Sequence, residues 1–224
     1  MYVAIEGVIG VGKTSLARLL QPAFQSEILL EIFEENPFLT DFYSDRERYA
    51  FQTQIFFLLS RYHQQRRTIP GLMAAGKSLI SDYTFAKDAL FARINLRGDE
   101  LDMYYRVHEA LAEKIPKPDL TVYLRADTDV LMQRIALRDR TYERNMERDY
   151  IDRLNRAYEE FFAKPYDSTP ALTIDTNSLN IIQNAAHLKL IENRIREALS
   201  LGPYQPGLPL GDAAAGSRPP ERGD

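Results

Sequence analysis

The sequence contains no cysteine among its 224 residues. Disulfide bonds, thiolate metal sites and cysteine nucleophiles are therefore excluded. Histidine is almost as scarce, because only His63, His108 and His187 occur, and their wide spacing does not match that of a metal-binding motif. Any metal ion is expected to arrive with a bound ligand rather than to occupy a site built from these side chains.

Targeting signals and a strongly basic charge are lacking as well. The first residues carry no basic stretch, and the longest strongly apolar run, Ile55–Leu59, is far shorter than the roughly 20 residues of a membrane span. A net charge of −4 argues against a general nucleic-acid-binding surface, which would favour a basic face. We therefore expect a cytoplasmic protein with no nucleic-acid or membrane partner.

The composition changes near the C-terminus. Residues 202–224 hold five glycines and five prolines and offer little apolar surface to bury. Such a composition is typical of disorder. The length suits one domain, so we expect a folded domain over residues 1–201 and a disordered tail over residues 202–224.

Five short apolar segments have the continuous hydrophobic pattern of parallel strands that are buried on both faces. They are Tyr2–Glu6, Ile28–Phe33, Ser78–Asp82, Leu120–Leu124 and Ala171–Asp175. Helical patterns separate the strands, and the clearest run over residues 45–67, 100–113 and 149–163. This alternation predicts an α/β fold in which helices cover both faces of a five-stranded parallel sheet.

The strongest motif matches G-x-x-x-x-G-K-[ST] and lies between a predicted strand and a helix-forming run, as a phosphate-binding loop (P-loop) does. Its backbone N–H groups would surround phosphate oxygens at the positive end of the helix. Lys13 would reach the β- and γ-phosphates of a nucleoside triphosphate, and Thr14 would offer its hydroxyl to Mg²⁺. The residues expected to bind the nucleotide here are Gly7, Gly10, Val11, Gly12, Lys13, Thr14 and Ser15.

A cluster of arginines follows the fourth predicted strand. Arg134 and Arg138 are four residues apart and share one helix face, and Arg140 follows closely. Phosphoryl transfer requires cations around the moving group, and small kinases close such cations over the site as a lid. We therefore expect these three arginines to act on the phosphates. From Arg144 onward, arginines alternate with acids, which favours an ion-paired surface.

Two further absences narrow the choice among P-loop proteins. The chain has no N-K-x-D stretch, which reads guanine in GTPases, and no apolar strand that ends in adjacent Asp-Glu, which many ATPase motors have. What remains is a small P-loop protein with an acceptor site and a lid.

Over residues 1–201 the sequence resembles the deoxyribonucleoside kinases, especially the bacterial deoxyadenosine and deoxyguanosine kinases. The shared motifs are Gly7–Thr14, Glu31 within Glu31–Leu39, Phe51–Gln54 leading to Ser60-Arg61, Asp82-Tyr83-Thr84 leading to Asp88, and Arg134–Arg140 leading to Glu143. The resemblance implies a P-loop kinase fold with an arginine-rich lid. It also implies transfer of the γ-phosphate of ATP to the 5′-hydroxyl of a deoxynucleoside, Mg²⁺ as cofactor, and a homodimer formed by the helices at 45–67 and 100–113.

The resemblance assigns roles to two acids. Glu31 is expected to be the general base, at the end of a second strand beside the P-loop strand, whereas the residues alone leave Glu34 and Glu35 as alternatives. Asp82 is expected to organise Mg²⁺ and the attacking hydroxyl. The family has an arginine after this acid, but this chain has Tyr83. The cation usually offered to the 5′-oxygen is therefore expected to be missing.

The same resemblance implies the remaining substrate contacts. Gln54 and Arg61, two helical turns apart, would read the base together with Asp88. Tyr43 and Glu143 would hold the sugar 3′-hydroxyl; the alternatives are that Tyr43 only packs and that Glu143 is one more lid charge.

Base preference depends on Asp88, because an ionised carboxylate only accepts hydrogen bonds. It would favour the amino group of adenine or cytosine over the carbonyl oxygen of guanine or thymine. Gln54 matches the adjacent donor and acceptor of adenine. The sequence therefore predicts deoxyadenosine, with deoxycytidine as an alternative, and deoxyguanosine if Arg61 faces the base while Asp88 only holds it.

Two other functions remain as alternatives. A nucleoside monophosphate kinase of the thymidylate kinase type would need a cationic site for the acceptor's own phosphate. A non-catalytic nucleotide-binding switch would bind a nucleotide without turnover. By the resemblance, Asp175 would lie near the base of the donor nucleotide.

Overall fold

The computed structural model describes residues 1–144, 146–164 and 169–202, so the predicted tail, apart from Gly202, lies outside the described residues. Its centre is a sheet of five strands, β1 (Tyr2–Glu6), β2 (Ser26–Leu29), β3 (Ser78–Ser81), β4 (Leu120–Arg125) and β5 (Ala171–Asp175). All neighbouring strands pair in parallel, in the order β2-β3-β1-β4-β5. The predicted five-stranded parallel sheet is confirmed. The expectation that the second strand lies beside the P-loop strand is wrong, because β3 separates β2 from β1.

The second strand is shorter than its apolar run predicts. β2 ends at Leu29, whereas the sequence predicted a strand to Phe33. The backbone N–H of Glu31 donates to the Asp82 Oδ1 atom at 2.8 Å, and the Gln64 side chain donates to the Leu30 carbonyl at 2.9 Å. Side chains thus satisfy this backbone in place of a neighbouring strand. The chain leaves the sheet here and brings Glu31 to the end of β3.

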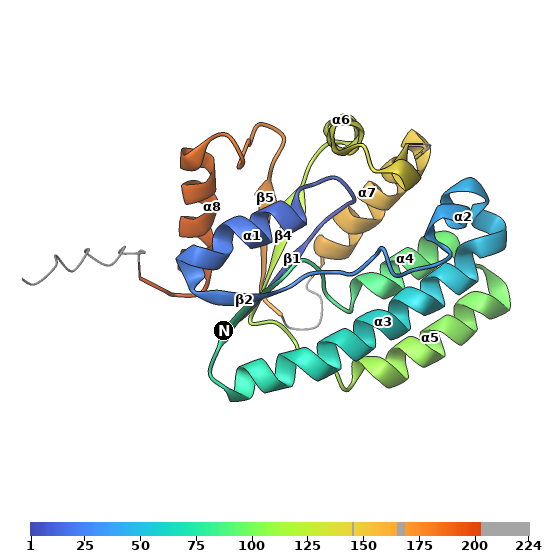
Figure 1. The fold of residues 1–224 in the computed structure, drawn as a ribbon, viewed down its shortest axis with the longest axis horizontal. Coiled ribbons are helices and arrows are strands. Elements are labelled where there is room, and N and C mark those ends of the chain that lie inside the picture. Colours follow the sequence, from blue (N-terminus) through green and yellow to red (C-terminus); the bar gives the residue numbers. More distant parts are fainter. Residues whose placement is uncertain (145, 165–168, 203–224) are drawn as a thin grey trace, which may run out of the picture.

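Helices cover both faces of the sheet (Figure 1). On one side lie α1 (Lys13–Phe24) and α8 (Ala185–Ala198), and on the other α3 (Arg46–Ala74), α4 (Lys87–Asn95), α5 (Gly98–Ala112) and α7 (Arg148–Phe162). Toward the carboxyl ends of the strands lie α2 (Leu39–Ser44), α6 (Thr128–Arg138) and the short 3₁₀ helix η1 (Thr141–Glu143). None of the helices in the described ranges combines the length and apolar character that crossing a membrane requires.

The long helix α3 carries polar residues on its buried side. It begins where the Asp45 side chain accepts a hydrogen bond from the Arg48 N–H, and it continues through Pro70 to Ala74, beyond the predicted end at residue 67. Its buried residues include Gln54 and Arg61. Buried polar side chains are rare unless they are paired or functional, so this face of α3 is a candidate wall for a ligand site.

Candidate active site

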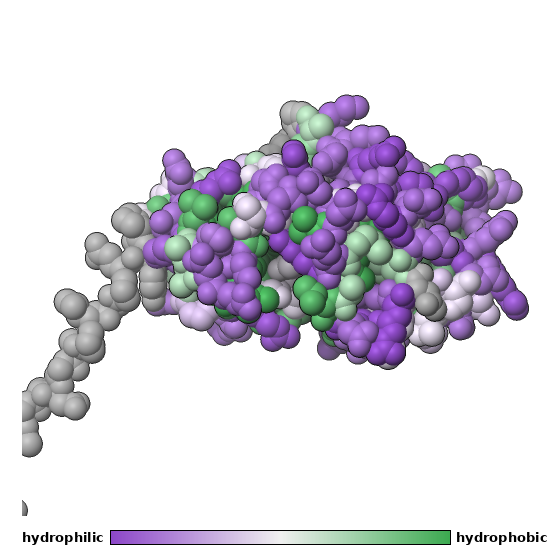
Figure 2. Space-filling view, turned by 90° about the horizontal axis from the view of Figure 1, so that it is seen from above, coloured by the Kyte–Doolittle hydropathy of each residue, from purple (hydrophilic) through white to green (hydrophobic). Residues whose placement is uncertain are grey.

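A cleft of about 790 Å³ opens at the end of the molecule that holds α2 and α6. Figure 2 looks onto this end and shows a hollow, edged by hydrophobic residues, in a mostly hydrophilic face. The cleft brings together most of the residues that the sequence singled out, namely Gly10, Val11, Gly12, Lys13, Thr14, Ser15, Glu31, Tyr43, Gln54, Arg61, Asp82, Arg134, Arg138, Arg140 and Glu143.

The glycines of the P-loop are needed for its close packing. Gly7 has φ 144°, and a Cβ atom there would lie 2.4 Å from the Leu124 carbonyl oxygen. Gly10 has φ 88°, and its Cβ atom would lie 2.9 Å from the Leu131 carbonyl oxygen. Helix α1 follows at Lys13, and no described side chain caps its first turn. The free N–H groups at this helix start suit an anion such as phosphate.

Lys13 is folded back into the loop. Its Nζ atom donates to the carbonyl oxygens of Gly7 at 2.6 Å and Val8 at 3.1 Å. Burial, and then the charge of Lys87, lowers the pKa of Lys13 to about 8, against the opposing effect of nearby acids. A phosphate in the loop would add negative charge beside this half-buried ammonium and favour its charged form.

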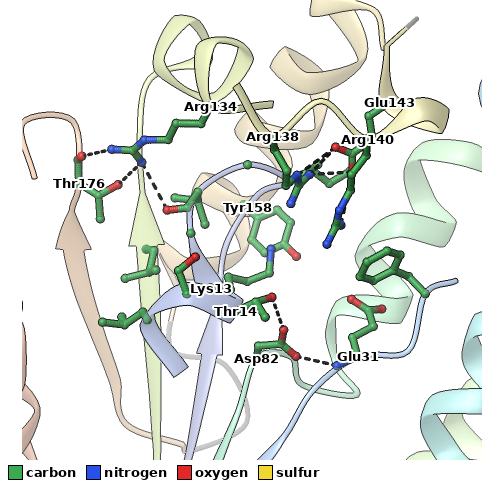
Figure 3. Close-up of a pocket in the computed structure, with 18 of the residues that line it drawn as sticks. Lys13, Thr14, Glu31, Asp82, Arg134, Arg138, Arg140, Glu143, Tyr158 and Thr176 are labelled. Carbon is green, nitrogen blue, oxygen red and sulfur yellow. Dashed lines mark hydrogen bonds and ion pairs between the residues drawn. The ribbon is translucent and has the colours of Figure 1, made fainter. Parts of the chain in front are cut away.

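Two oxygen-bearing side chains meet at the base of the cleft (Figure 3). The Thr14 hydroxyl donates to Asp82 Oδ2 at 2.5 Å, while Asp82 Oδ1 accepts the Glu31 N–H. Hydroxyl and carboxylate oxygens are ligands that Mg²⁺ accepts, and it usually takes its remaining ligands from water and substrate phosphates. Within residues 1–144, 146–164 and 169–202, no group of three acidic or histidine side chains could hold a metal ion. These two residues therefore fit an ion that enters with nucleotide phosphates.

Glu31 is held by two cations. Its Oε1 atom accepts hydrogen bonds from Arg61 Nε at 2.7 Å and from Arg61 Nη2, and its Oε2 atom accepts one from Lys87 Nζ at 2.7 Å. Burial would raise the pKa of Glu31, but Arg61 and Lys87 outweigh it and hold that pKa well below its usual range. Glu34 and Glu35 are exposed and do not line the cleft. Among the three candidate acids, Glu31 is the one that faces the P-loop.

Arg61 connects Glu31 to the buried end of α4. It forms an ion pair with Asp88, whose side chain is fully buried, and its guanidinium lies 4.6 Å from the Phe57 ring centroid. Arg61 and Gln54 line the cleft, whereas Asp88 lies behind Arg61 and does not. The predicted base-reading residues are thus brought together, with the arginine and the glutamine presented to the cleft.

Two lid arginines gather around one acid. The Arg138 guanidinium donates to both carboxylate oxygens of Glu143 at 2.6–3.1 Å, and Arg140 Nη1 lies 3.7 Å from Glu143 Oε1. Arg140 also covers the Phe33 ring at 4.0 Å. In the view of Figure 3 both side chains lie above Lys13. They are therefore placed where cations could reach phosphates in the P-loop.

Arg134 has different contacts, although it shares a helix with Arg138. It donates to the Val11 carbonyl at 3.3 Å, to the Thr176 hydroxyl at 3.0 Å and to the Thr176 carbonyl at 2.6 Å (Figure 3). In this structure Arg134 therefore ties α6 to the P-loop and to the loop after β5. A direct contact of its guanidinium with phosphate would require these bonds to break.

The two remaining predicted positions differ in burial. The Tyr43 side chain lines the cleft, and burial, followed by the nearby Tyr150 and Glu143, raises its pKa well above the usual range. Its hydroxyl therefore stays protonated and available as a donor. Asp175 is half-exposed and accepts a hydrogen bond from the Asn177 N–H at 2.9 Å. Asn177, rather than Asp175, lines the cleft.

Among the cleft residues that the sequence did not indicate, two make polar contacts near the proposed site. Lys87 contacts Glu31, and the Tyr158 hydroxyl donates at 3.2 Å to Oε2 of the buried Glu6. A lysine at the start of a helix and a tyrosine in an amphipathic helix follow no spacing rule. The available signal was indirect, because Lys87 directly precedes Asp88 in a segment that lacks a cation at Tyr83.

Comparisons with known proteins agree with this geometry. The family model for deoxynucleoside kinases matches residues 3–200. Deoxyguanosine kinase of Bacillus subtilis is 32% identical over 88% of this chain and 97% of its own length. Deoxyadenosine/deoxycytidine kinase of the same organism is 26% identical over 88% and 92%, respectively. The structure of deoxyadenosine kinase from M. mycoides with bound dCTP matches with a TM-score of 0.76 and 26% identity, covering 88% of this chain and all of that one. The predicted P-loop kinase fold is confirmed.

Proposed function

The chain belongs to the deoxynucleoside kinase family, and from this premise we propose that it transfers the γ-phosphate of ATP to the 5′-hydroxyl of a purine deoxynucleoside. The observation that carries the proposal is the position of Glu31. This carboxylate lines the same cleft as the P-loop, and two cations keep it ionised. An ionised carboxylate there is suited to accept a proton from a hydroxyl group that attacks a phosphate.

The donor triphosphate would bind in the P-loop. Backbone N–H groups and Lys13 would hold the phosphates, and Arg138 and Arg140 would exchange Glu143 for phosphate oxygens as the lid closes. Thr14 and Asp82 would hold Mg²⁺, and the ion would neutralise charge on the transferring group. These roles are supported by the short Thr14–Asp82 contact and by the free first turn of α1.

The acceptor would bind between α3 and the P-loop, with Tyr43 and Glu143 at its 3′-hydroxyl. The 5′-hydroxyl loses its proton to Glu31 as the oxygen forms a bond to the γ-phosphorus. The bond between that phosphorus and the β-phosphate oxygen breaks, which leaves ADP. In a loose transition state the bond between the attacking oxygen and phosphorus is only partly formed, so the hydroxyl need not lose its proton before it attacks. The hydroxyl becomes more acidic as this bond forms, and a carboxylate of low pKa can then accept its proton.

Deoxyadenosine is the acceptor that the carboxylate argument favours. Gln54, which lines the cleft, can pair with the adjacent donor and acceptor of adenine. The Asp88 carboxylate could attract the amino group of adenine if Arg61 moved aside. One observation favours deoxyguanosine as a second candidate. Arg61, a pure donor, lines the cleft, whereas Asp88 lies behind it. A donor at that position suits the O6 atom of guanine.

A homodimer formed through α3 and α5 is part of the proposal. Leu59 and Met73 of α3 and Met103 of α5 are exposed apolar side chains on the two helices that the sequence assigned to a dimer face. A second chain would cover them. The predicted cytoplasmic location stays a prediction.

The test is the release of ADP from ATP and Mg²⁺ in the presence of each of the four deoxynucleosides and, separately, of their monophosphates. We expect turnover with a purine deoxynucleoside and none above background with dAMP, dGMP or dTMP. Turnover with a monophosphate alone would assign the chain to the monophosphate kinase alternative. Nucleotide binding without turnover on any acceptor would favour the switch.

A further inference from the structure

Lys87 lies at a position that is energetically unfavourable for a lysine. Its side chain is only 5% exposed, and its Nζ atom lies 2.7 Å from Glu31 Oε2. Lysine is almost never buried unless it is paired. It also stands in the first turn of α4, where the positive end of the helix dipole disfavours a cation. Helix stability therefore does not explain Lys87, and its contact with Glu31 does.

The surrounding charges balance only when Lys87 is present. Glu31 and Asp88 carry two negative charges, and Arg61 and Lys87 carry two positive ones. Without Lys87, the half-buried Glu31 and the buried Asp88 would share Arg61 alone. Oε2 of Glu31 would then lose its contact with Lys87, and the carboxylate could turn more easily.

The aromatic ring of Tyr83 lies near the Lys87 ammonium group. The Tyr83 side chain is fully buried, its hydroxyl donates to Gln64 Oε1, and its ring centroid lies 5.5 Å from Lys87 Nζ. An ammonium near the face of an aromatic ring is stabilised. Tyr83 thus supplies no charge of its own to the cleft, but it helps to hold the lysine that does.

The charge of Lys87 also reaches the donor side. After burial, Lys87 is the largest influence that lowers the pKa of Lys13. Glu31 therefore lies between two ammonium groups, one that contacts it directly and one in the P-loop.

We propose that Lys87 is a positioning residue for phosphoryl transfer, which holds the Glu31 carboxylate in the orientation that accepts the 5′-hydroxyl proton. The inference rests on the proposed function. A cation beside a carboxylate disfavours proton uptake, so Lys87 does not act by making Glu31 a stronger base. It binds Oε2 while Arg61 binds Oε1, and the two contacts together keep the carboxylate from turning.

The first test determines the orientation of the Glu31 carboxylate, in protein without substrate, from crystal structures of four variants. Lys87→Met and Lys87→Gln remove the cation, Lys87→Arg keeps it, and Lys77→Met is the surface control because Lys77 is half-exposed. We expect the Glu31 carboxylate to turn from its wild-type orientation in the two neutral variants and to keep it in the other two. An unchanged orientation in a folded Lys87→Met or Lys87→Gln protein overturns the proposal, whatever the acceptor substrate proves to be.

The second test uses turnover of the best purine deoxynucleoside. Lys87→Met should lower kcat about 10- to 100-fold, the range for loss of a charge-assisted hydrogen bond, with KM changed less than kcat. In a Glu31→Gln background, Lys87→Met should cause little further loss, because Lys87 acts through Glu31.

The two tests separate the failure of each idea. Equal losses from Lys87→Met in both backgrounds would contradict the positioning role while leaving the kinase assignment intact. Absence of wild-type turnover on every deoxynucleoside would remove the proposed function, and the crystal structures would still decide whether Lys87 sets the orientation of Glu31.

Discussion

The two sides of the cleft are held together differently. On the acceptor side, the side chains of Glu31, Arg61 and Lys87 are 16%, 6% and 5% exposed and bind one another. On the proposed lid, Arg138 and Arg140 are 34% and 29% exposed, although the Glu143 carboxylate that they contact is only 4% exposed. Breaking a buried pair leaves an uncompensated charge, whereas the charge of an exposed side chain is solvated by water. We therefore expect the acceptor side to be prearranged, and the two lid arginines to move once a bound ligand satisfies Glu143.

The largest effect is expected at Lys13, which lies between the two sides. Lys13→Ala should lower kcat at least about 10³-fold, because a cation on the transferring phosphoryl group acts mainly in the transition state. The deoxynucleoside should still bind, since the acceptor side does not depend on this lysine. Near-normal kcat in a folded variant would show that the P-loop assignment is wrong.

Next in size is the loss expected on the acceptor side. Glu31→Gln keeps the size of the side chain but removes the proton acceptor, and kcat should fall about 10²–10⁴-fold. Glu34→Gln and Glu35→Gln are matched controls with kcat near wild type, because both acids are exposed outside the cleft. If Glu34→Gln rather than Glu31→Gln caused the large loss of kcat, Glu31 would not be the general base.

A smaller loss is expected from the lid. Arg140→Ala should lower kcat about 10- to 100-fold, somewhat below the loss typical of a rigid donor to developing charge, because the lid must first rearrange. Arg144→Ala is the control, since Arg144 pairs with Asp139 on the surface, where both side chains are more than half exposed. Steady-state kinetics should give Arg144→Ala within twofold of wild type; equal losses for both arginines would remove the distinction between lid and surface.

The smallest expected effect is the choice of base. A mismatch of buried hydrogen-bonding groups costs about 1–3 kcal/mol, so kcat/KM for deoxyadenosine should exceed that for deoxyguanosine about tenfold. Asp88→Asn should narrow this ratio, because the amide can also donate. A wild-type preference for deoxyguanosine would mean that Arg61 reads the base and that Asp88 only holds it.

Hydrophobic periodicity and motifs predicted most of the secondary structure. Four of the five strands begin at the predicted residue and end within one residue of the predicted end, and the P-loop lies where the motif placed it. The second strand was predicted too long because Leu30 and Phe33 are apolar. What ends it is a hydrogen bond from the Glu31 backbone to Asp82, some fifty residues away in the sequence, and no local pattern shows such a contact.

The candidate site was predicted less completely than the secondary structure. Spacing placed Arg134 and Arg138 on one helix, but it did not show that Arg134 binds the Val11 and Thr176 carbonyls. The sequence did not predict a role for Lys87, because that role depends on its contact with Glu31 in the folded structure. Sequence patterns identify residue types that suit phosphate chemistry, whereas the charge balance of the acceptor side depends on contacts between elements far apart in the chain.

We expect the acceptor side to be complete before the donor binds. Calorimetric titration of the wild-type protein with deoxyadenosine and with deoxyguanosine, with and without a non-hydrolysable ATP analogue, measures this directly. One deoxynucleoside per chain should bind saturably without any nucleotide, and the analogue should tighten this binding less than about tenfold. Binding that is detected only when the analogue is present would show that the acceptor side is completed by the donor.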